Sequence, residues 1–337
     1  MTRLVFGVLC WTALAAAHDR EWLPLPAAPP EPADNPTTPG KVALGKALFF
    51  DPRFSPGGAT SCNTCHDLMN GGADDRPLPP QQAPARNAPT VWNAAFHTLQ
   101  RWDGRATSLE EQTRIALTDR VEMALPGTTV MLQRLRAIPG YRALFAAAFE
   151  GKAPVTIDNA VKALAAYERT LVTPDAPYDR YVKGEKRALS DEQIRGMETF
   201  AAIGCVKCHA GPTFDGATLS NGRGLLMKSP TYARAKVVAK YRLLKDRGRF
   251  ELTKHPGDDH LWRVPTLRNL LYTAPYFHNG AVPTLEEAVR VMAKTELDQN
   301  LVDSDVNAIV AFLGALSGGF PEQTLPRLPP GTGMLPR

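Results

Sequence analysis

One short pattern occurs twice in this chain and constrains its fold more than any other feature. Two cysteines separated by two residues are followed by a histidine in Cys62-Asn63-Thr64-Cys65-His66 and in Cys205-Val206-Lys207-Cys208-His209. This pattern is typical of covalent c-type haem, in which both thiols form thioethers and the histidine binds the iron. A pair of zinc or redox sites is the alternative, but the further ligands that zinc needs at matching spacing are missing. The sequence therefore predicts two haems, one held by Cys62, Cys65 and His66 and the other by Cys205, Cys208 and His209.

Residues 1–17 have the pattern of a cleavable export signal. Arg3 supplies a positive charge, residues 4–16 an apolar stretch, and residues 15–17 a small-residue cleavage site. Cleavage would remove Cys10, which leaves four cysteines, all of them in the two motifs. An uncleaved anchor is the alternative, but the apolar stretch is too short to cross a bilayer, and no run of about 18 apolar residues occurs elsewhere. We expect a periplasmic protein without a membrane span.

The spacing of the motifs predicts two domains. The 337 residues are 44% hydrophobic and 22% charged, as in globular proteins, and the net charge of +5 gives no indication of nucleic-acid binding. The motifs begin 143 residues apart, one in each half of the chain. We expect an all-α fold with two cytochrome-c-like domains, residues 18–183 and 184–320, followed by a proline-rich tail, residues 321–337.

Helical patterns support this fold class. Apolar residues recur at helical spacing in segments 39–50, 108–117, 129–137, 141–149, 157–171, 190–203, 284–293 and 303–316. Capping boxes, Ser190 with Gln193 and Thr284 with Glu287, mark the starts of two of them. No strand-rich segment competes, and residues 210–262 form a long connection rich in glycine and basic residues.

The second axial ligand of each iron decides whether that haem transfers electrons or reacts with an oxidant. Met292, in a helical segment, is a candidate for the second haem, although a methionine on a helix is more often part of a core. His278 is another side chain that could approach the haem edge. For the first haem, no histidine lies between His66 and His97, and Met69 is too close to His66 to cross the ring. The sequence predicts an open distal face on the first haem.

An open haem needs acid–base help to cleave an O–O bond. Gln112 and Glu122 lie ten residues apart and could converge on one pocket, where a carboxylate can move the peroxide proton from one oxygen to the other. A solvated glutamate on a loop is the alternative. His97 is expected to be a structural histidine, and the basic segment 228–249 a solvated loop rather than a docking surface.

Several longer stretches resemble the bacterial di-haem cytochrome c peroxidases along almost the whole chain after the signal. They are Leu44–Arg53, Ser61–His66, Arg86–Thr90, Trp102–Ala106, Tyr167–Leu171, Pro265–Asn269 and Thr273–Gly280. The resemblance implies a low-potential peroxide site at the first haem and a high-potential electron entry at the second haem, with Met292 as axial ligand. It also implies Gln112 and Glu122 as catalytic residues and Trp102 as the electron carrier between the haems. A calcium ion at the domain interface would be held by the Asn87 side chain and by backbone oxygens of Thr273 and Pro275.

One departure from the family concerns the loop after the first motif. Many members carry a removable distal histidine there, whereas this loop is shorter and has Gln81 and Gln82 but no histidine. We therefore expect an enzyme that needs no reductive activation. The expected function is reduction of hydrogen peroxide with electrons from a small periplasmic donor, a cytochrome c or a cupredoxin, by a homodimer. Two alternatives stay open: a maturase-like enzyme that oxidises tryptophan in a partner protein, and a di-haem electron carrier.

Overall fold

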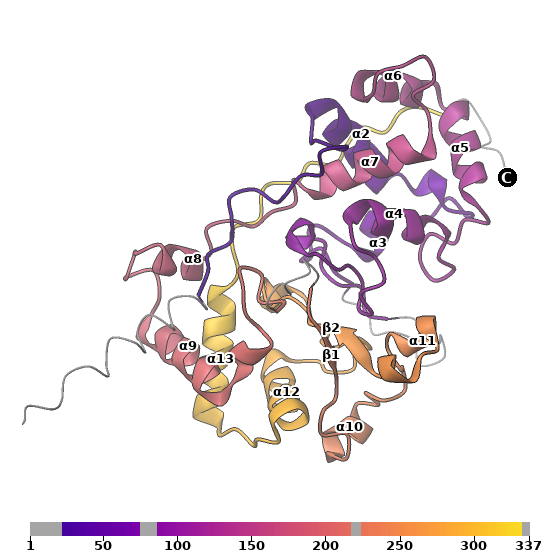
Figure 1. Ribbon diagram of the computed structural model, residues 1–337. Helices are drawn as coiled ribbons and strands as arrows, with labels where there is room; N and C mark the ends of the chain where they lie inside the picture. The colour runs from indigo at the N-terminus through magenta and orange to yellow at the C-terminus, as the bar shows by residue number, and fades with distance from the viewer. Residues whose placement is uncertain (1–21, 75–85, 217–223, 332–337) are drawn as a thin grey trace, which may run out of the picture.

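The computed structural model describes residues 22–74, 86–216 and 224–331. The expected export signal, residues 1–17, lies outside the described residues, as do Gln81, Gln82 and the last six residues of the expected tail. The α-helices are α2 (Pro39–Phe50), α3 (Cys62–Cys65), α4 (Leu109–Thr118), α5 (Thr128–Ala137), α6 (Pro139–Ala148), α7 (Ile157–Glu168), α8 (Pro177–Val182), α9 (Asp191–Ile203), α10 (Lys236–Lys240), α11 (Phe250–Thr253), α12 (Leu285–Leu297) and α13 (Asp303–Ala315) (Figure 1). Strands β1 (Leu226–Lys228) and β2 (Leu261–Arg263) and the 3₁₀ turns η1 (Pro52–Phe54), η2 (Ala94–Phe96), η3 (Cys205–Lys207), η4 (Pro256–Asp258) and η5 (Leu270–Tyr272) lie between them.

The N-terminal lobe is built on the crossing of α2 and α7. A Cβ atom at Gly45 would collide with the carbonyl oxygen of Ala163, so glycine is what allows the two helix backbones to approach so closely. Phe49 and Tyr167 then meet edge to face across the crossing, with ring centroids 5.4 Å apart. Helices α5 and α6 complete this core, and Cys62 of the first cysteine motif packs against it.

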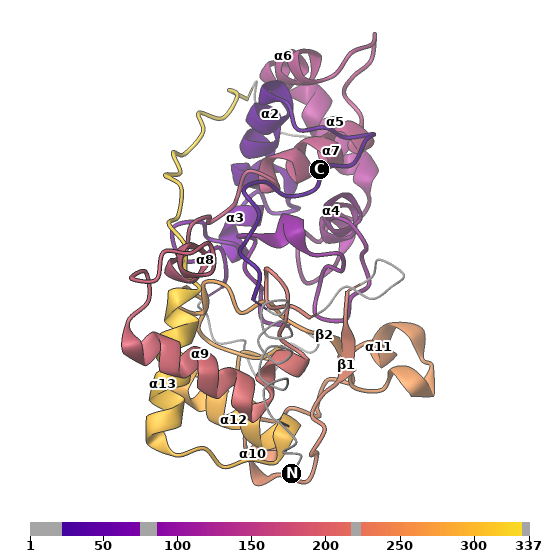
Figure 2. The same ribbon diagram turned by 60° about the vertical axis from the view of Figure 1, so that its left-hand side comes forward.

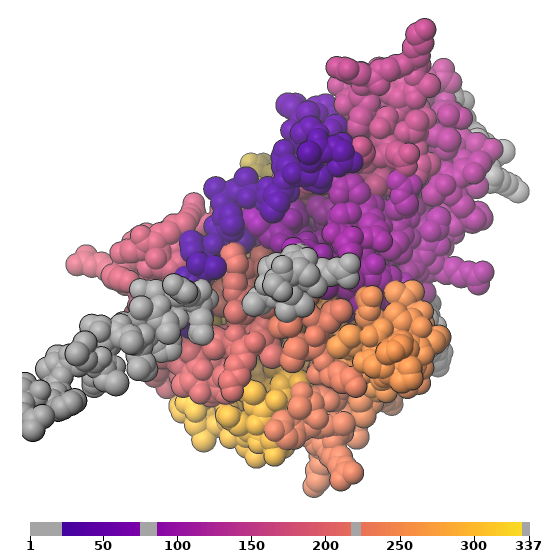
Figure 3. Space-filling model, viewed as in Figure 1, coloured from indigo at the N-terminus to yellow at the C-terminus, as the bar shows by residue number. Residues whose placement is uncertain are grey.

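The C-terminal lobe repeats this construction with α9 and α13. Here Gly196 approaches the carbonyl of Ala308, which again brings two helices into backbone contact. Phe200 of α9 and Phe312 of α13 pack with centroids 5.5 Å apart, and α12 packs against α13. Figure 3 shows the two lobes lying against each other along a broad front.

Both ends of the described chain cross to the opposite lobe. Trp22 packs against Phe312 in the C-terminal core, with centroids 5.8 Å apart. Beyond α13, the tail runs along the outside of the N-terminal lobe (Figure 2), where Phe320 meets Trp92 at 5.1 Å and Gln323 accepts a hydrogen bond from the Tyr167 hydroxyl at 3.0 Å. Helix α8, which precedes the expected boundary at residues 183–184, also packs on the C-terminal core.

The mainly helical class is confirmed, with differences in detail. Helix α7 ends at Glu168, three residues before the expected end, and α12 continues to Leu297, where Asp298 takes a left-handed conformation with φ of 52°. The long connection contains a two-stranded antiparallel sheet, in which Leu226 pairs with Arg263. Strands of three residues are too short for a pattern of alternating hydrophobicity, so this sheet could not be predicted from the sequence.

Candidate functional site

The first cysteine motif forms α3, a single helical turn. The Ser61 N–H donates to Thr64 Oγ1 at 2.9 Å, and the His66 N–H donates to the Cys62 carbonyl at 2.9 Å, which closes the turn. The His66 ring places Nδ1 3.0 Å from the Pro89 carbonyl. Since a carbonyl only accepts, Nδ1 carries the proton and Nε2 keeps the lone pair that a metal requires. Burial lowers the pKa of His66, which favours this neutral imidazole.

The second motif reaches the same result from a different local structure. Helix α9 ends at Ile203, and the next residue, Gly204, has a φ of 104° that turns the chain into η3. The His209 N–H donates to the Cys205 carbonyl at 2.9 Å, and its ring Nδ1 lies 2.9 Å from the Phe214 carbonyl. Burial lowers the pKa of His209 as well. Both motifs therefore present a neutral imidazole with Nε2 available to iron.

The four cysteines fit covalent haem better than zinc or a redox pair. No disulfide joins them, and burial raises the pKa of the Cys62 thiol to about 12 and that of Cys205 to about 11. In the described part of the chain, no group of three or more His, Cys, Asp or Glu side chains could hold a metal ion.

Gln112 and Glu122 converge on one guanidinium, that of Arg101. Arg101 Nε donates to Gln112 Oε1 at 2.7 Å, and its Nη2 lies 2.5 Å from Glu122 Oε1 as an ion pair. Gln112 belongs to α4, which Ser108 caps by accepting from the Glu111 N–H at 3.1 Å, whereas Glu122 follows in the next turn. Burial raises the pKa of Glu122 and Arg101 opposes that rise, while about a third (32%) of its side chain stays exposed. A carboxylate in this setting can exchange a proton with a small substrate.

Sequence reasoning missed Arg101. It follows Gln100, whose N–H donates to the Ala106 carbonyl at 2.7 Å and so pinches the loop of residues 100–106. Arg101 takes a left-handed backbone conformation with φ of 69°, which is unusual for arginine. This conformation could not be predicted from the sequence. Only its position directly before Trp102 could have drawn attention to it.

Trp102 lies where the two lobes meet. Its indole N–H donates to the Asn87 carbonyl at 2.7 Å, and its own carbonyl accepts from the Arg263 N–H of β2 at 2.8 Å. The indole meets the His278 ring edge to face at 6.4 Å, and His278 in turn stacks on Trp262 at 4.2 Å. Burial lowers the pKa of His278 to about 4, so this ring is neutral near pH 7. Trp102 thus contacts residues of both halves of the chain.

Two of the expected calcium ligands are in contact. Asn87 Nδ2 lies 2.6 Å from the Pro275 carbonyl oxygen, while Asn87 Oδ1 is buried and no hydrogen-bond partner reaches it from the described residues. Because the two ends of an amide are assigned by their surroundings, a cation at this point would turn Oδ1 towards the carbonyl. Thr273 lies two residues before Pro275, at the end of η5. An amide and backbone carbonyls are the oxygen ligands that calcium accepts, so this donor set fits the ion.

The remaining candidates are placed less fully. Met292 is half-buried on α12, next to the buried Val291. Met69 is 78% exposed, so it serves neither the core nor the first motif. His97 Nδ1 lies 2.6 Å from Asp215 Oδ2, which is the structural role expected for it, although the partner comes from the other half of the chain. No described helix is long and apolar enough to cross a membrane.

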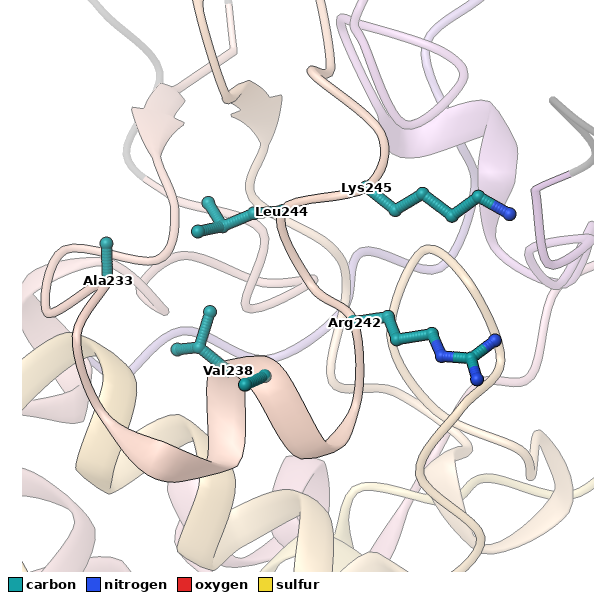
Figure 4. Close-up of a pocket in the computed structure, with 6 residues that line it drawn as sticks. Ala233, Val238, Arg242, Leu244 and Lys245 are labelled. Atoms are coloured by element: carbon teal, nitrogen blue, oxygen red, sulfur yellow. The ribbon is translucent and has the colours of Figure 1, made fainter.

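A surface hollow of about 290 Å³ lies at α10 and the loop after it. Figure 4 shows Ala233, Val238 and Leu244 gathered on one side, while the Arg242 and Lys245 side chains extend the other way. None of the candidate catalytic or haem-binding residues lines this hollow.

The chain is similar to several known proteins. A family model described as di-haem cytochrome c peroxidase matches residues 39–187, and one described as RoxA-like, cytochrome c-like, matches residues 262–296. The cytochrome c551 peroxidase of Pseudomonas aeruginosa is 42% identical and covers 96% of this chain and 92% of its own length. The protein of the same name from Nitrosomonas europaea is 38% identical, with coverages of 99% and 95%.

Other similar proteins are MauG proteins and two solved structures. The methylamine utilization protein MauG of Methylorubrum extorquens is 34% identical, over 90% of this chain and 86% of its own. The crystal structure of a MauG-like protein associated with microbial copper homeostasis superimposes with a TM-score of 0.72 at 28% identity, covering 88% of this chain and 94% of the other. The fold of the di-haem peroxidase BthA from Burkholderia thailandensis is also similar, with a TM-score of 0.64 at 22% identity and coverages of 88% and 95%.

Proposed function

Because the chain belongs to the di-haem cytochrome c peroxidase family, we propose that it reduces hydrogen peroxide to water with electrons from a small periplasmic redox protein, a cytochrome c or a cupredoxin. Each peroxide takes up two electrons and two protons and gives two water molecules. The observation that carries this proposal is the convergence of Gln112 and Glu122 on Arg101 in the same lobe as the first cysteine motif.

The motif residues fit two covalent haems, which supply electron transfer and an iron at which peroxide can bind. In this proposal Cys62, Cys65 and His66 hold the peroxide-binding haem, whereas Cys205, Cys208, His209 and Met292 hold the electron-entry haem. The anchored Nδ1 atoms support both histidine assignments. The half-buried place of Met292 on α12 is compatible with a ligand but does not distinguish it from a core residue.

Glu122 is the proton carrier in this mechanism. Its carboxylate accepts the proton of one peroxide oxygen and returns it to the other, while the Gln112 amide orients the substrate. The raised pKa of Glu122 brings this carboxyl nearer to the pH at which it would work, so that it both accepts and releases a proton readily. Trp102 lies between the two halves and is proposed to carry the electrons across.

We also propose that the first iron has no side chain on its distal face. Among the described residues, His97 is engaged with Asp215 and His278 is stacked on Trp262. Met69 is largely exposed. The fully oxidised resting protein is therefore expected to give a high-spin signal from the first haem. Two low-spin haems in that state would contradict the proposal.

A calcium ion at Asn87, Thr273 and Pro275 and a homodimer complete the proposal. The buried Asn87 Oδ1, which no donor of the described residues reaches, supports the ion, since an acceptor without a donor is costly to bury. Light scattering of the haem-loaded protein tests the homodimer, and a mass equal to that of one chain would contradict it.

Replacement of Glu122 by glutamine tests the peroxidase function. The variant keeps the shape of the side chain and loses the proton carrier, so we expect peroxide turnover with reduced cytochrome c to fall by about 10²–10⁴ at unchanged haem content. Glu185→Gln is the matched control, because Glu185 is an exposed residue paired with Arg180 at 3.0 Å. Rapid turnover in both proteins would refute the role of Glu122, whereas negligible peroxide turnover in both would favour a di-haem electron carrier.

The identity to MauG proteins supports one other candidate, an enzyme that oxidises tryptophan in a partner protein. The resemblance implies a tyrosine in those enzymes at the position of Met292. Rapid peroxide turnover with reduced cytochrome c supports the peroxidase. Slow turnover, together with oxidation of a partner encoded by a neighbouring gene, supports the maturase-like enzyme.

A further inference from the structure

Arg101 is the centre of the charged groups around the candidate catalytic pair. Beyond its contacts with Gln112 and Glu122, its Nη1 lies 3.4 Å from Asp119 Oδ2. Only about a tenth (11%) of the Arg101 side chain is exposed. An arginine fork this well buried and shared by three side chains has little freedom to move, because a change in its position would break several contacts at once.

The backbone of Arg101 is fixed from the other lobe. Its carbonyl accepts from Arg263 Nε at 3.2 Å, and the next carbonyl, that of Trp102, accepts from the Arg263 N–H at 2.8 Å. The Arg101 side chain meets the catalytic pair, whereas the neighbouring Trp102 indole meets Asn87 and His278. Arg101, which contacts the acid–base pair, and Trp102, the proposed electron carrier, are thus neighbours in one loop.

We propose that Arg101 is a positioning residue for peroxide reduction, which holds the side chains of Gln112 and Glu122 together and supplies the positive charge that faces the Glu122 carboxylate. This inference rests on the proposed peroxidase function and adds a residue to it. Arg101 needs no contact with peroxide for this role, because it acts through the two side chains that it holds.

The charges around Glu122 show in which direction its pKa would change if Arg101 were removed. Burial and Asp119 raise the pKa of Glu122, while Arg101 and Arg105 lower it. Arg105 is itself committed to Asp103 at 2.6 Å, so Arg101 is the closer counter-charge. Without Arg101 the carboxylate would face Asp119 with less compensation, and its pKa would rise further.

The pH dependence of kcat/KM for peroxide, measured on the haem-loaded protein with reduced cytochrome c, tests this inference. The acid limb of that profile reports a base in the free enzyme. An opposite charge within about 4–6 Å lowers a carboxyl pKa by roughly 1–3 units. We therefore expect Arg101→Gln to move the acid limb up by about one pH unit or more, which lowers kcat/KM roughly tenfold at pH values below the limb.

Two further variants separate positioning from folding. Arg101→Lys keeps the charge but loses the fork, so we expect an acid limb close to that of wild type and a lower kcat. Arg114→Gln is the matched control, because Arg114 lies on α4 but pairs with Asp158 at an exposed site, at 2.6 Å. It is expected to leave both kcat and the acid limb unchanged.

The results that would overturn the inference are distinct from failure of the proposed function. An acid limb at the wild-type pH in Arg101→Gln would refute it, as would wild-type kcat and KM in Arg101→Lys. The second result holds even if Arg101→Gln does not load haem. A wild-type protein without peroxide turnover would instead refute the proposed function itself.

Discussion

The buried ion pair between Asp179 and Arg268 gives the sharpest stability prediction. The pair joins α8 to the segment after β2, and the two side chains are 0% and 1% exposed. Arg268 donates to both carboxylate oxygens of Asp179 at 2.8 Å and also to the Pro212 carbonyl, three residues after His209. Asp179 in turn accepts from the Leu25 N–H at 2.8 Å. The pair therefore fastens the N-terminal segment and the loop of the second motif to α8.

Replacement of Asp179 by asparagine keeps the size of the side chain and removes its charge. The Arg268 guanidinium then stays buried without a counter-ion, and removal of one partner of a buried pair costs about 3–5 kcal/mol. We expect urea denaturation of the haem-loaded protein to show that loss in the free energy of unfolding, with an unchanged dependence on urea concentration.

Asp175→Asn is the matched control. Asp175 pairs with Lys183 at 3.0 Å, but the two side chains are 68% and 49% exposed, so the change should cost under about 1 kcal/mol. Adding Arg268→Met to Asp179→Asn should recover part of the loss, because it removes the unpaired charge. If Asp179→Asn were no more destabilising than Asp175→Asn, the conclusion that the buried pair stabilises the C-terminal lobe would be refuted.

Three other predictions concern the helix crossing, a buried carboxyl and the cation site. Gly45→Ala should destabilise the protein by about 1–3 kcal/mol in the same urea assay, because the added methyl group meets the Ala163 carbonyl, whereas Gly57→Ala, in open space, should not. Burial raises the pKa of Glu168 to about 8, so the folded state holds a proton that the unfolded state loses above its ordinary pKa of about 4.5. Stability should therefore fall by up to about 1.4 kcal/mol per pH unit between these values, and Glu168→Gln should flatten this fall; an equal slope in that variant would contradict the assignment. Removal of calcium with a chelator should lower the thermal midpoint of wild type, and Asn87→Ala should abolish that response; a midpoint unaffected by the chelator would refute the ion site.

Much of the fold could be predicted because its signals are local. Ser190 and Thr284 cap α9 and α12 as the capping patterns indicate, by accepting from the N–H groups of Gln193 and Glu287. The sequence predicts the end of α12 at residue 293, four residues too early, because the last turn of the helix is polar. Asp298 ends the helix in a left-handed conformation, which few residues other than glycine adopt. The crossing of the chain ends could not be predicted, since Trp22 and Phe320 find their partners through contacts far apart in sequence.

The candidate site divides in the same way. His66 and His209 follow from spacing alone, because covalent attachment fixes the ligand next to the cysteines. Gln112 and Glu122 were candidates from their spacing, and the resemblance implied their catalytic role; the structure adds that one guanidinium joins them. Arg101 itself could not be identified, because its role depends on a left-handed backbone conformation within a pinched loop and on a contact with the other lobe.

The crossing of the chain ends has a consequence for any attempt to divide this protein. A protease that cut the segment between α8 and α9 would produce two fragments. The N-terminal fragment would still carry Trp22 and α8, which pack in the C-terminal core. The C-terminal fragment would still carry Phe320, which packs in the N-terminal core. Each fragment would stay bound to the other through an apolar side chain, so the cleaved protein should elute from gel filtration as a single species. For the same reason, either piece produced by itself would expose an unfilled surface where the missing anchor sits.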